Sequence, residues 1–241
     1  MRLATRRRRT NALEDEQLLW AWQSASLLLG YPDDDLRARL PLVRRAVEAL
    51  PASVAGPLGT TLEHLEHADW DEAQAEYVET FDTRRRHNLF LTYFAHGDTR
   101  KRGLALLRFK QTYLEAGFVP DDCELPDHLC VVLEFAATVD AATGKQLMLD
   151  HRAGLELLRI SLAEVGSPWA GAVAAVCATL PPLGEDEWDA VRRLAAEGPP
   201  EEEVGLTPYA TPGFDPGPAA PEAGPAAGPV SLPMPSFPGA R

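Results

Sequence analysis

Apolar residues recur every three or four positions along most of the chain, which is the spacing of amphipathic helices. The first helix is predicted from about Ala12 to Leu29, where Gly30 and Pro32 end it. A second helix follows Asp33 as its cap, and Pro41 is expected to break or kink it. The apolar stripe of this second helix consists of Leu36, Leu40, Val43, Val47 and Leu50.

The middle of the chain continues this pattern with one irregular segment. A short helix is predicted over Thr60 to His67, and a helix that starts near Asp69 carries the stripe Trp70, Ala73, Tyr77 and Phe81. The segment from Asp82 to His96 mixes aromatic and basic residues. We interpret it as helical because no second convincing strand is available to pair with it. The turn Gly97-Asp98-Thr99 then starts a helix that runs to Ala116.

Four further helices are expected before residue 199. Pro120 to Pro126 reads as a polar loop, and Pro126 suits the first position of a helix that runs to about Val139. A longer helix is predicted from Gly144 to about Val165, and another starts at Ser167-Pro168 and ends at Pro181. The last helix contains Trp188, Val191 and Leu194, with Gly198 as its stop.

The two ends of the chain differ from this helical region in composition. Residues 199–241 hold 12 of the 21 prolines and 6 of the 18 glycines, which predicts a disordered tail. Residues 1–10 are a basic flexible arm rather than an export signal, since Asn11, Glu14 and Asp15 follow where an apolar segment is required. The sequence therefore predicts an all-α fold, a single-domain helical bundle over residues 11–198 with a disordered Pro/Gly-rich C-terminal tail.

Charge and cysteine content narrow the class of protein. The net charge of −13 argues against nucleic-acid binding, although residues 84–110 carry eight basic residues against one acid. This basic belt is a plausible docking surface for a charged partner. No apolar run approaches the roughly 20 residues that cross a bilayer. Three cysteines without a CxxC motif argue against a disulfide framework or a zinc site and are typical of a cytoplasmic protein.

The sequence does not indicate an enzyme. It contains no GxGxxG, no P-loop, no HExxH and no GxSxG motif. One alternative is a metal-dependent hydrolase that uses His64, His67 and His96, although the first two read more simply as part of a solvated face. A second alternative is a nucleic-acid binder that uses the basic belt, which the net charge opposes.

Three stretches are unusual for a plain helical bundle. Tyr77 to Asp82 places two aromatic residues at helical spacing beside an acid. Tyr93 to Gly103 puts the basic triplet Arg100-Lys101-Arg102 at a helix start, where an anion is favoured. Glu124 to Leu129 puts Asp127 in the expected first helical turn, next to His128, which titrates near neutrality.

These stretches together resemble the nitrate reductase delta-subunit family, the NarJ-like molybdenum-cofactor assembly chaperones. The similarity spans about Leu18 to Leu194 in matching order. It rests on Leu28 to Pro32, Tyr77 to Asp82 with Arg84 to Arg86, Leu91 to Tyr93, His96 to Gly103, Leu106 to Lys110, Glu124 to Leu129 and Leu133 to Phe135. The resemblance implies the helical fold of the redox-enzyme maturation chaperone superfamily and a protein that is not an enzyme.

The resemblance also implies partners. Family members bind the N-terminal segment of the apo catalytic α subunit of respiratory nitrate reductase, or the αβ complex, and work with the machinery that inserts the molybdenum cofactor. They delay membrane docking until maturation and are not part of the final enzyme. No cofactor is then bound permanently, and molybdopterin guanine dinucleotide carried by the client is contacted transiently. The alternative client is another molybdoenzyme, such as a sulfoxide or amine-oxide reductase.

A helical bundle whose apolar stripes are not all mutually covered leaves a groove for an amphipathic peptide. We expect Tyr77, Phe81, Leu129 and Leu133 to wall this groove, with Asp82, Asp127 and His128 as polar anchors at its rim. Arg100, Lys101 and Arg102 are expected to contact an acidic part of the client or the phosphates of its cofactor. No metal ligands are predicted.

Overall fold

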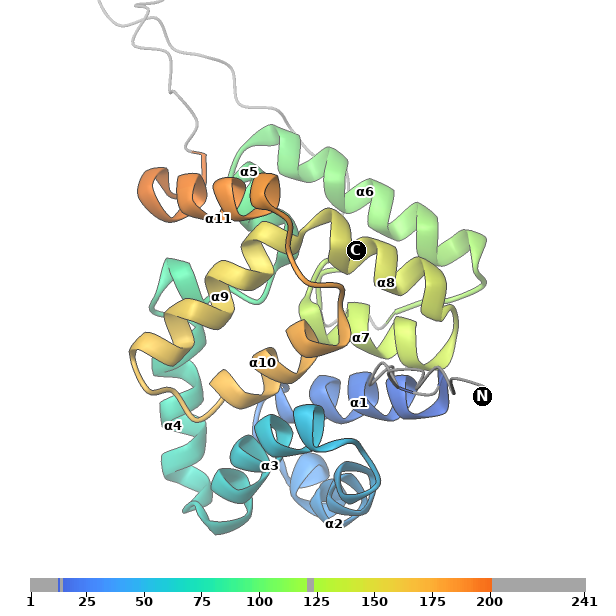
Figure 1. Cartoon of the computed structure of the whole chain (residues 1–241), viewed down its shortest axis with the longest axis vertical. Helices are drawn as coiled ribbons and strands as arrows, with labels where there is room; N and C mark the ends of the chain where they lie inside the picture. Colours follow the sequence, from blue (N-terminus) through green and yellow to red (C-terminus); the bar gives the residue numbers. More distant parts are fainter. Residues whose placement is uncertain (1–12, 14, 121–123, 201–241) are drawn as a thin grey trace, which may run out of the picture. The chain divides into compact units, whose positions relative to one another are not determined.

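The computed structural model describes residue 13 and residues 15–120 and 124–200, and most of these residues lie in helices (Figure 1). The predicted all-α fold is confirmed, because the described part of the chain contains no strand beyond one isolated bridge between Phe90 and His128. The predicted basic arm and nearly all of the predicted tail lie outside the described residues. The helices are α1 (Asp15–Leu28), α2 (Asp34–Glu48), α3 (Ala52–His67), α4 (Trp70–Phe81), the 3-10 helix η1 (Arg85–His87), α5 (Leu91–His96), α6 (Arg100–Glu115), α7 (Leu129–Thr138), α8 (Ala141–Asp150), α9 (Arg152–Glu164), α10 (Ala170–Thr179) and α11 (Glu185–Glu197).

Several helix starts are set by the caps that the sequence predicts. The side chain of Asp33 accepts a hydrogen bond from the backbone N–H of Leu36 at 2.7 Å, and Asp69 accepts from two backbone N–H groups at the start of α4. Thr99 occupies the N-cap position of α6, but its hydroxyl donates to the carbonyl of His96 instead of capping the helix. Gly198 ends α11 with a φ of 75°, as expected for a C-terminal glycine.

Pro41 and Pro57 lie inside helices and do not end them, although proline disfavours the interior of a helix. Of the break or kink expected at Pro41, the break is wrong, since α2 continues through this residue to Glu48. The expected start of the next helix at Thr60 is also wrong, because α3 begins at Ala52 and includes Pro57. Both helices bury an apolar stripe, and this burial outweighs the lost backbone hydrogen bond.

Two further boundaries differ from the prediction. The helix expected to start at Pro126 begins at Leu129, with His128 as its N-cap. The single helix expected from Gly144 to Val165 is two helices, α8 and α9, that join at His151. The break at His151 lets α8 pack against α7 while α9 packs against α10 and α11. Tertiary packing, which the local pattern does not report, therefore decides both boundaries.

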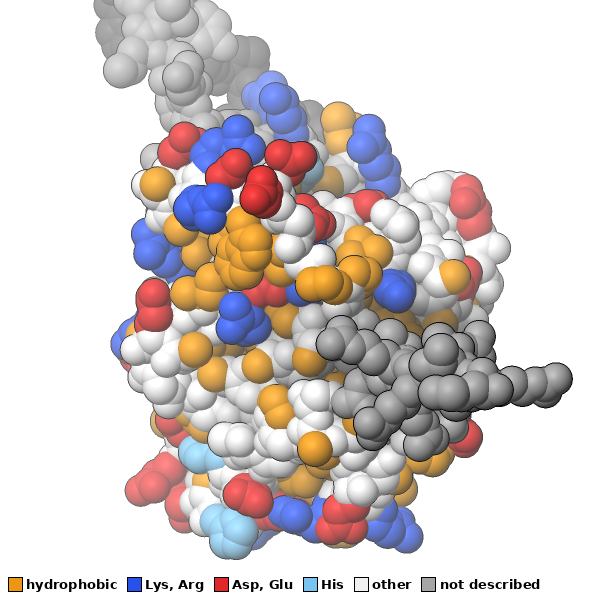
Figure 2. All heavy atoms as spheres, in the orientation of Figure 1, with side chains coloured by type: hydrophobic (Ala, Val, Ile, Leu, Met, Phe, Trp, Pro, Cys, Tyr) orange, Lys and Arg blue, Asp and Glu red, His pale blue; other side chains and the backbone are white. Residues whose placement is uncertain are grey.

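Helix α1 lies at the centre of the packing, against α2, α3, α7 and α10 (Figure 1). Trp22 of α1 is fully buried, and its indole N–H donates to the hydroxyl of Thr179 at 2.9 Å. Trp169, before α10, is also fully buried. On the face shown in Figure 2, hydrophobic side chains gather where α11 lies over α9, and Val191 of α11 is buried there. The described helices thus share one apolar core.

Helices α10 and α3 approach each other closely, and a glycine makes this possible. A Cβ atom built on Gly171 would lie 2.2 Å from the carbonyl oxygen of Pro57, which is well inside van der Waals contact. A carbonyl on a packed helix cannot move aside easily, so only glycine fits at this crossing. Gly59 of α3 contrasts with Gly171, since its added Cβ would meet nothing within 4 Å.

We predict opposite effects for Gly171→Ala and Gly59→Ala. The first should lower the free energy of unfolding by about 1–3 kcal/mol because the new methyl group forces the helices apart. The second should raise it by about 1 kcal/mol because alanine favours a helix interior. Urea denaturation followed by circular dichroism measures both. Equal effects of the two substitutions would contradict the close packing of α3 and α10.

Candidate functional site

A hollow of about 510 Å³ opens where four distant parts of the chain meet. These parts are the turn after α1, the end of α4, the segment before α5 and the loop that leads into α7. The lining residues are Gly30, Tyr31, Tyr77, Phe81, Asp82, Asn88, Leu89, Phe90, Glu124, His128 and Cys130. A hollow of this size is in the range of ligand-binding pockets.

Aromatic rings form one side of the hollow and connect it to the core. The rings of Tyr77 and Phe81 lie 4.7 Å apart, and both pack edge-on against the buried ring of Trp169. Tyr77 is fixed further because its hydroxyl donates to the carbonyl of Leu29 at 2.9 Å. Tyr31 packs edge-on against Tyr77 at 5.5 Å and remains 48% exposed. The hollow therefore has a rigid aromatic wall with one exposed aromatic at its edge.

The polar side chains that line the hollow include two carboxylates, an imidazole, a thiol and the amide of Asn88. Asp82 and Glu124 are exposed acids at its opening. Burial lowers the pKa of His128, which keeps the imidazole neutral at neutral pH. Burial likewise raises the pKa of the Cys130 thiol far above its usual range. A protonated thiol is a poor nucleophile and a poor metal ligand, so Cys130 does not supply the hollow with a reactive thiolate.

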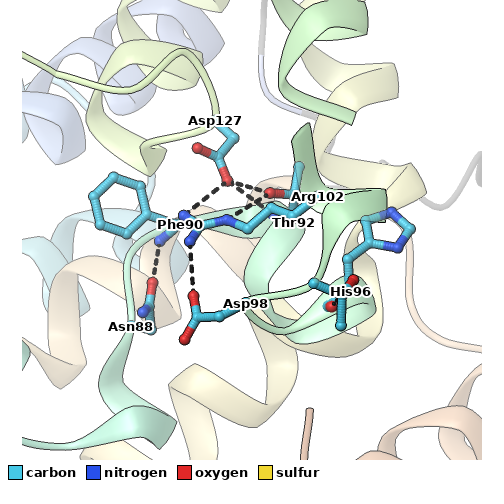
Figure 3. A network of polar contacts seen from close by, with 8 residues as sticks. Asn88, Phe90, Thr92, His96, Asp98, Arg102 and Asp127 are labelled. Carbon is cyan, nitrogen blue, oxygen red and sulfur yellow. Dashed lines mark hydrogen bonds and ion pairs between the residues drawn. The ribbon is translucent and has the colours of Figure 1, made fainter. Parts of the chain in front are cut away.

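Asp127 lies behind this hollow, in a buried polar network that joins the loop before α7 to α5 (Figure 3). Its Oδ2 accepts hydrogen bonds from the backbone N–H and the hydroxyl of Thr92, at 3.1 and 2.5 Å. Thr92 is the second residue of α5, which has no cap of its own, so Asp127 caps this helix from 35 residues away. The backbone supports the junction, since Leu91 N–H donates to Asp127 O and Leu129 N–H donates to Leu89 O.

Arg102 completes the network and links it to the wall of the hollow (Figure 3). Its guanidinium donates to Asp98 at 3.2 Å and lies 3.9 Å from the Asp127 carboxylate. It also sits over the ring of Phe90, 5.2 Å from its centre, and that ring packs edge-on against His128. Phe90 is thus held between Arg102 and His128, and the network fixes a second wall of the hollow.

The structure brings together four of the seven residues predicted for the groove, Tyr77, Phe81, Asp82 and His128. The other three, Asp127, Leu129 and Leu133, are 0% exposed and present no surface to a partner in this structure. The expectation that Asp127 lies in the first turn of a helix is wrong, because α7 starts two residues later. Leu129 and Leu133 belong to the apolar stripe of α7. The same sequence pattern is expected whether such a stripe packs in the core or lines a groove, and here it packs in the core.

The predicted basic triplet does not form one surface. Arg100 and Lys101 are exposed at the first turn of α6, whereas the side chain of Arg102 is only 16% exposed and points into the polar network. Sequence reasoning also missed Tyr31, Phe90 and Glu124 as lining residues. All three lie within or beside the stretches singled out in the sequence, but in loops, where apolar periodicity carries no signal.

A second hollow of about 550 Å³ lies between α1 and α2 and is more apolar, with Trp20, Leu27 and Leu42 among its lining residues. It is a competing location for an apolar ligand. No group of three histidine, cysteine or acidic side chains within the described ranges is placed to hold a metal ion, so the hydrolase alternative gains no support. None of the described helices is long and apolar enough to span a bilayer.

Comparison with known proteins identifies the family. Residues 47–175 match the family described as nitrate reductase delta subunit, which is more than half of the chain. This chain belongs to the nitrate reductase delta-subunit family. The predicted membership is therefore confirmed, and the hollow described above is built largely from the part of the chain that matches.

Relatives within the delta-subunit family include assembly chaperones. The chain is 30% identical to the NarJ protein of Bacillus subtilis strain 168 over 174 residues, covering 72% of this chain and 94% of that protein. It is 34% identical to the nitrate reductase molybdenum cofactor assembly chaperone NarJ of Escherichia coli K12, covering 60% of this chain and 63% of NarJ. It is also 42% identical over 170 residues to the nitrate reductase-like protein NarX of Mycobacterium tuberculosis H37Rv. That match covers 70% of this chain but only about a quarter of NarX.

A solved structure agrees on the fold. A protein from Archaeoglobus fulgidus, described as a redox enzyme maturation protein, aligns with a TM-score of 0.50 and 24% identity. The alignment covers 68% of this chain and 93% of the archaeal one. This chain therefore shares its helical fold with the archaeal protein.

We predict that Asp127→Ala strongly destabilises this delta-subunit family member. Removing the carboxylate leaves the backbone N–H of Thr92 and the charge of Arg102 without their buried partner, which should cost about 2–4 kcal/mol. Asp98→Ala is the matched control, because Asp98 also pairs with Arg102 but is 77% exposed. It should cost less than about 1 kcal/mol. Urea unfolding measures both, and comparable losses would show that burial of Asp127 is unimportant.

Proposed function

We propose that this chain is a chaperone for the assembly of a respiratory nitrate reductase, and that it binds the N-terminal segment of the apo catalytic α subunit during molybdenum cofactor insertion. The observation that carries the proposal is the hollow with an aromatic wall and an acidic opening. The residues that line it are spread along the chain between Gly30 and Cys130, and the chain belongs to the delta-subunit family. The assembly role named for the relatives NarJ of E. coli and B. subtilis supports the same function.

The geometry of the hollow suits an amphipathic peptide. Apolar side chains of the peptide would pack against Tyr31, Tyr77 and Phe90, and its polar groups would meet Asp82 and His128 at the opening. Affinity should be moderate, because a flexible segment loses conformational entropy when it binds. Moderate affinity also suits a chaperone that must release its client.

Binding and release of this kind fit the larger role that the family resemblance implies. A chaperone that covers the N-terminal segment of the catalytic subunit, alone or in the αβ complex, delays membrane docking while the cofactor insertion machinery acts. The chaperone then leaves and is not part of the final enzyme. We propose that these steps take place in the cytoplasm.

The basic start of α6 is the surface that we assign to a second contact. Arg100 and Lys101 are exposed there and could meet an acidic part of the client, or transiently the phosphates of the molybdopterin guanine dinucleotide that the client carries. Arg102 is not part of this surface, because its guanidinium is held by Asp98 and Asp127. The chaperone itself then holds no cofactor permanently.

Co-purification from nitrate-respiring cells tests the identity of the client. We expect a tagged form of this chain to recover the catalytic subunit of nitrate reductase. Recovery should increase when molybdenum cofactor synthesis is blocked, because the immature client accumulates. Recovery of a sulfoxide or amine-oxide reductase instead would assign the chain to another molybdoenzyme, and recovery of mature enzyme alone would contradict a role in assembly.

Two exposed side chains test which hollow binds the client peptide. Tyr31→Ala removes an aromatic from the edge of the proposed site and should weaken binding about 5- to 20-fold, as for an aromatic contact residue of an interface. Leu42→Ala, in the second hollow between α1 and α2, should change affinity less than about twofold. Calorimetry with a synthetic peptide of the client N-terminus measures both. The reverse order would move the site to the second hollow.

A further inference from the structure

Helix α6 presents a row of leucines to solvent. Its inner face is held by Phe109 and Tyr113, which are the buried residues of this helix. On the opposite face Leu104 and Leu107 are each 63% exposed, and Leu114 is 51% exposed. Figure 1 shows α6 along the outside of the helical body. Single exposed leucines are ordinary on a protein surface, but three in one row on one helix indicate a contact surface.

The three leucines have the spacing of a coiled-coil seam. Leu104, Leu107, Gln111 and Leu114 are separated by three, four and three residues, which are the steps between the a and d positions of a heptad. Phe109 then falls at position f, on the far side of the helix from the seam, and the structure buries it there. Helix α6 is thus packed on the body along one side and carries a pairing seam along the other.

Basic side chains flank the seam on both sides. At about 100° per residue, Lys101 and Arg108 lie along one edge of the leucine row and Lys110 along the other. All three are exposed, and no ion pair to any of them is found among the described residues. Glu115 is the one acid of α6, against five basic residues. The three flanking residues occupy positions e and g, whose charges select the partner of a coiled coil.

We infer that the solvent face of α6 docks an acidic amphipathic helix of a partner protein. Apolar side chains of that helix would meet the leucine seam, and its glutamates or aspartates would lie beside Lys101, Arg108 and Lys110. Burial of the leucines supplies affinity, and the flanking charges supply selectivity. Because α6 is already helical, only the partner helix has to become ordered on docking. This surface lies apart from the main hollow and does not depend on what fills it.

The composition of α6 favours a helix over a lipid surface. Gln111 lies in the middle of the leucine row, where insertion into hydrocarbon would bury its amide at a cost, whereas helix pairs tolerate one polar residue in the seam. Phe109 and Tyr113, the aromatic residues suited to a bilayer interface, face the protein instead. The net charge of −13 also opposes approach to an anionic membrane.

A second copy of this chain matches the surface less well than an acidic helix does. The five basic residues and one acid of α6 give it a charge of +4, so two such helices repel each other. A partner with acidic flanks replaces this repulsion with attraction on both sides of the seam.

Fluorescence anisotropy with the full-length protein and two labelled synthetic helices tests the inference. Both peptides have about three heptads with leucine at a and d. One carries glutamate at every e and g position and the other carries lysine, so like charges keep each peptide from pairing with itself. The protein variants are a leucine variant, Leu104→Gln with Leu107→Gln, and a charge variant, Arg108→Glu with Lys110→Glu.

The matched control is Leu42→Gln with Arg45→Glu on α2. These two residues are also an exposed leucine and an exposed base, with the same spacing as Leu107 and Lys110. The control should bind both peptides as the wild type does. Circular dichroism checks that every variant remains folded, as expected for substitutions of exposed side chains.

We expect the leucine variant to bind the glutamate peptide about tenfold more weakly than the wild type, because two apolar contacts are lost. The charge variant should bind the glutamate peptide about tenfold more weakly and the lysine peptide more tightly than the wild type does. Such a reversal distinguishes the α6 face from general attraction of a basic peptide to an acidic protein. Added salt should weaken binding of the glutamate peptide to the wild type.

Equal affinity of the glutamate peptide for the wild type and the leucine variant would overturn the inference, and so would a charge variant without effect on either peptide. Leucine-dependent co-sedimentation with phosphatidylglycerol vesicles, without binding of either peptide, would make the face a membrane contact instead. A dimer in analytical ultracentrifugation that the leucine variant abolishes would make it a self-association surface. Binding of the client peptide is measured alongside and should be the same in all variants, so failure of this inference leaves the proposed function standing.

Discussion

The arrangement of the main hollow depends on the carboxylate of Asp127, which is buried where the loop before α7 meets the start of α5. A buried carboxylate is costly unless hydrogen bonds and an opposite charge compensate it. Here the compensation comes from Thr92 and Arg102, which belong to α5 and α6. The requirement that the charge be satisfied therefore fixes the position of two helices relative to the loop before α7.

That local requirement determines the shape of the hollow. With Asp127 in place, the neighbouring His128 pairs with Phe90 through a short antiparallel bridge, and Arg102 covers the other side of the Phe90 ring. The opposite wall is fixed independently, since Tyr77 and Phe81 pack against Trp169 in the core. Both walls are thus held by interactions behind them, so the exposed rim residues can vary without disturbing the fold.

The sequence predicts the elements of this site better than their assembly. The helical spacing of Tyr77 and Phe81 and the acid after them grouped three residues that line one hollow in the structure, because α4 follows its local pattern. Asp127 was misplaced because Pro126-Asp127 resembles an ordinary helix start, whereas this acid caps a helix that is distant in the sequence. Leu129 and Leu133 were misplaced because periodicity identifies an apolar face and not what covers it. The loop residues Tyr31 and Glu124 follow no periodic pattern, so only the three-dimensional structure locates them.

The family match divides the hollow into two parts. Residues 47–175 supply nine of its lining residues, whereas Gly30 and Tyr31 come from the turn after α1, outside the matched segment. The matched part provides both walls and both acids. The exposed ring of Tyr31 closes the edge from a part of the chain that the family match does not include. A substitution of Tyr31 therefore alters the edge of the hollow and leaves the charge of its opening intact.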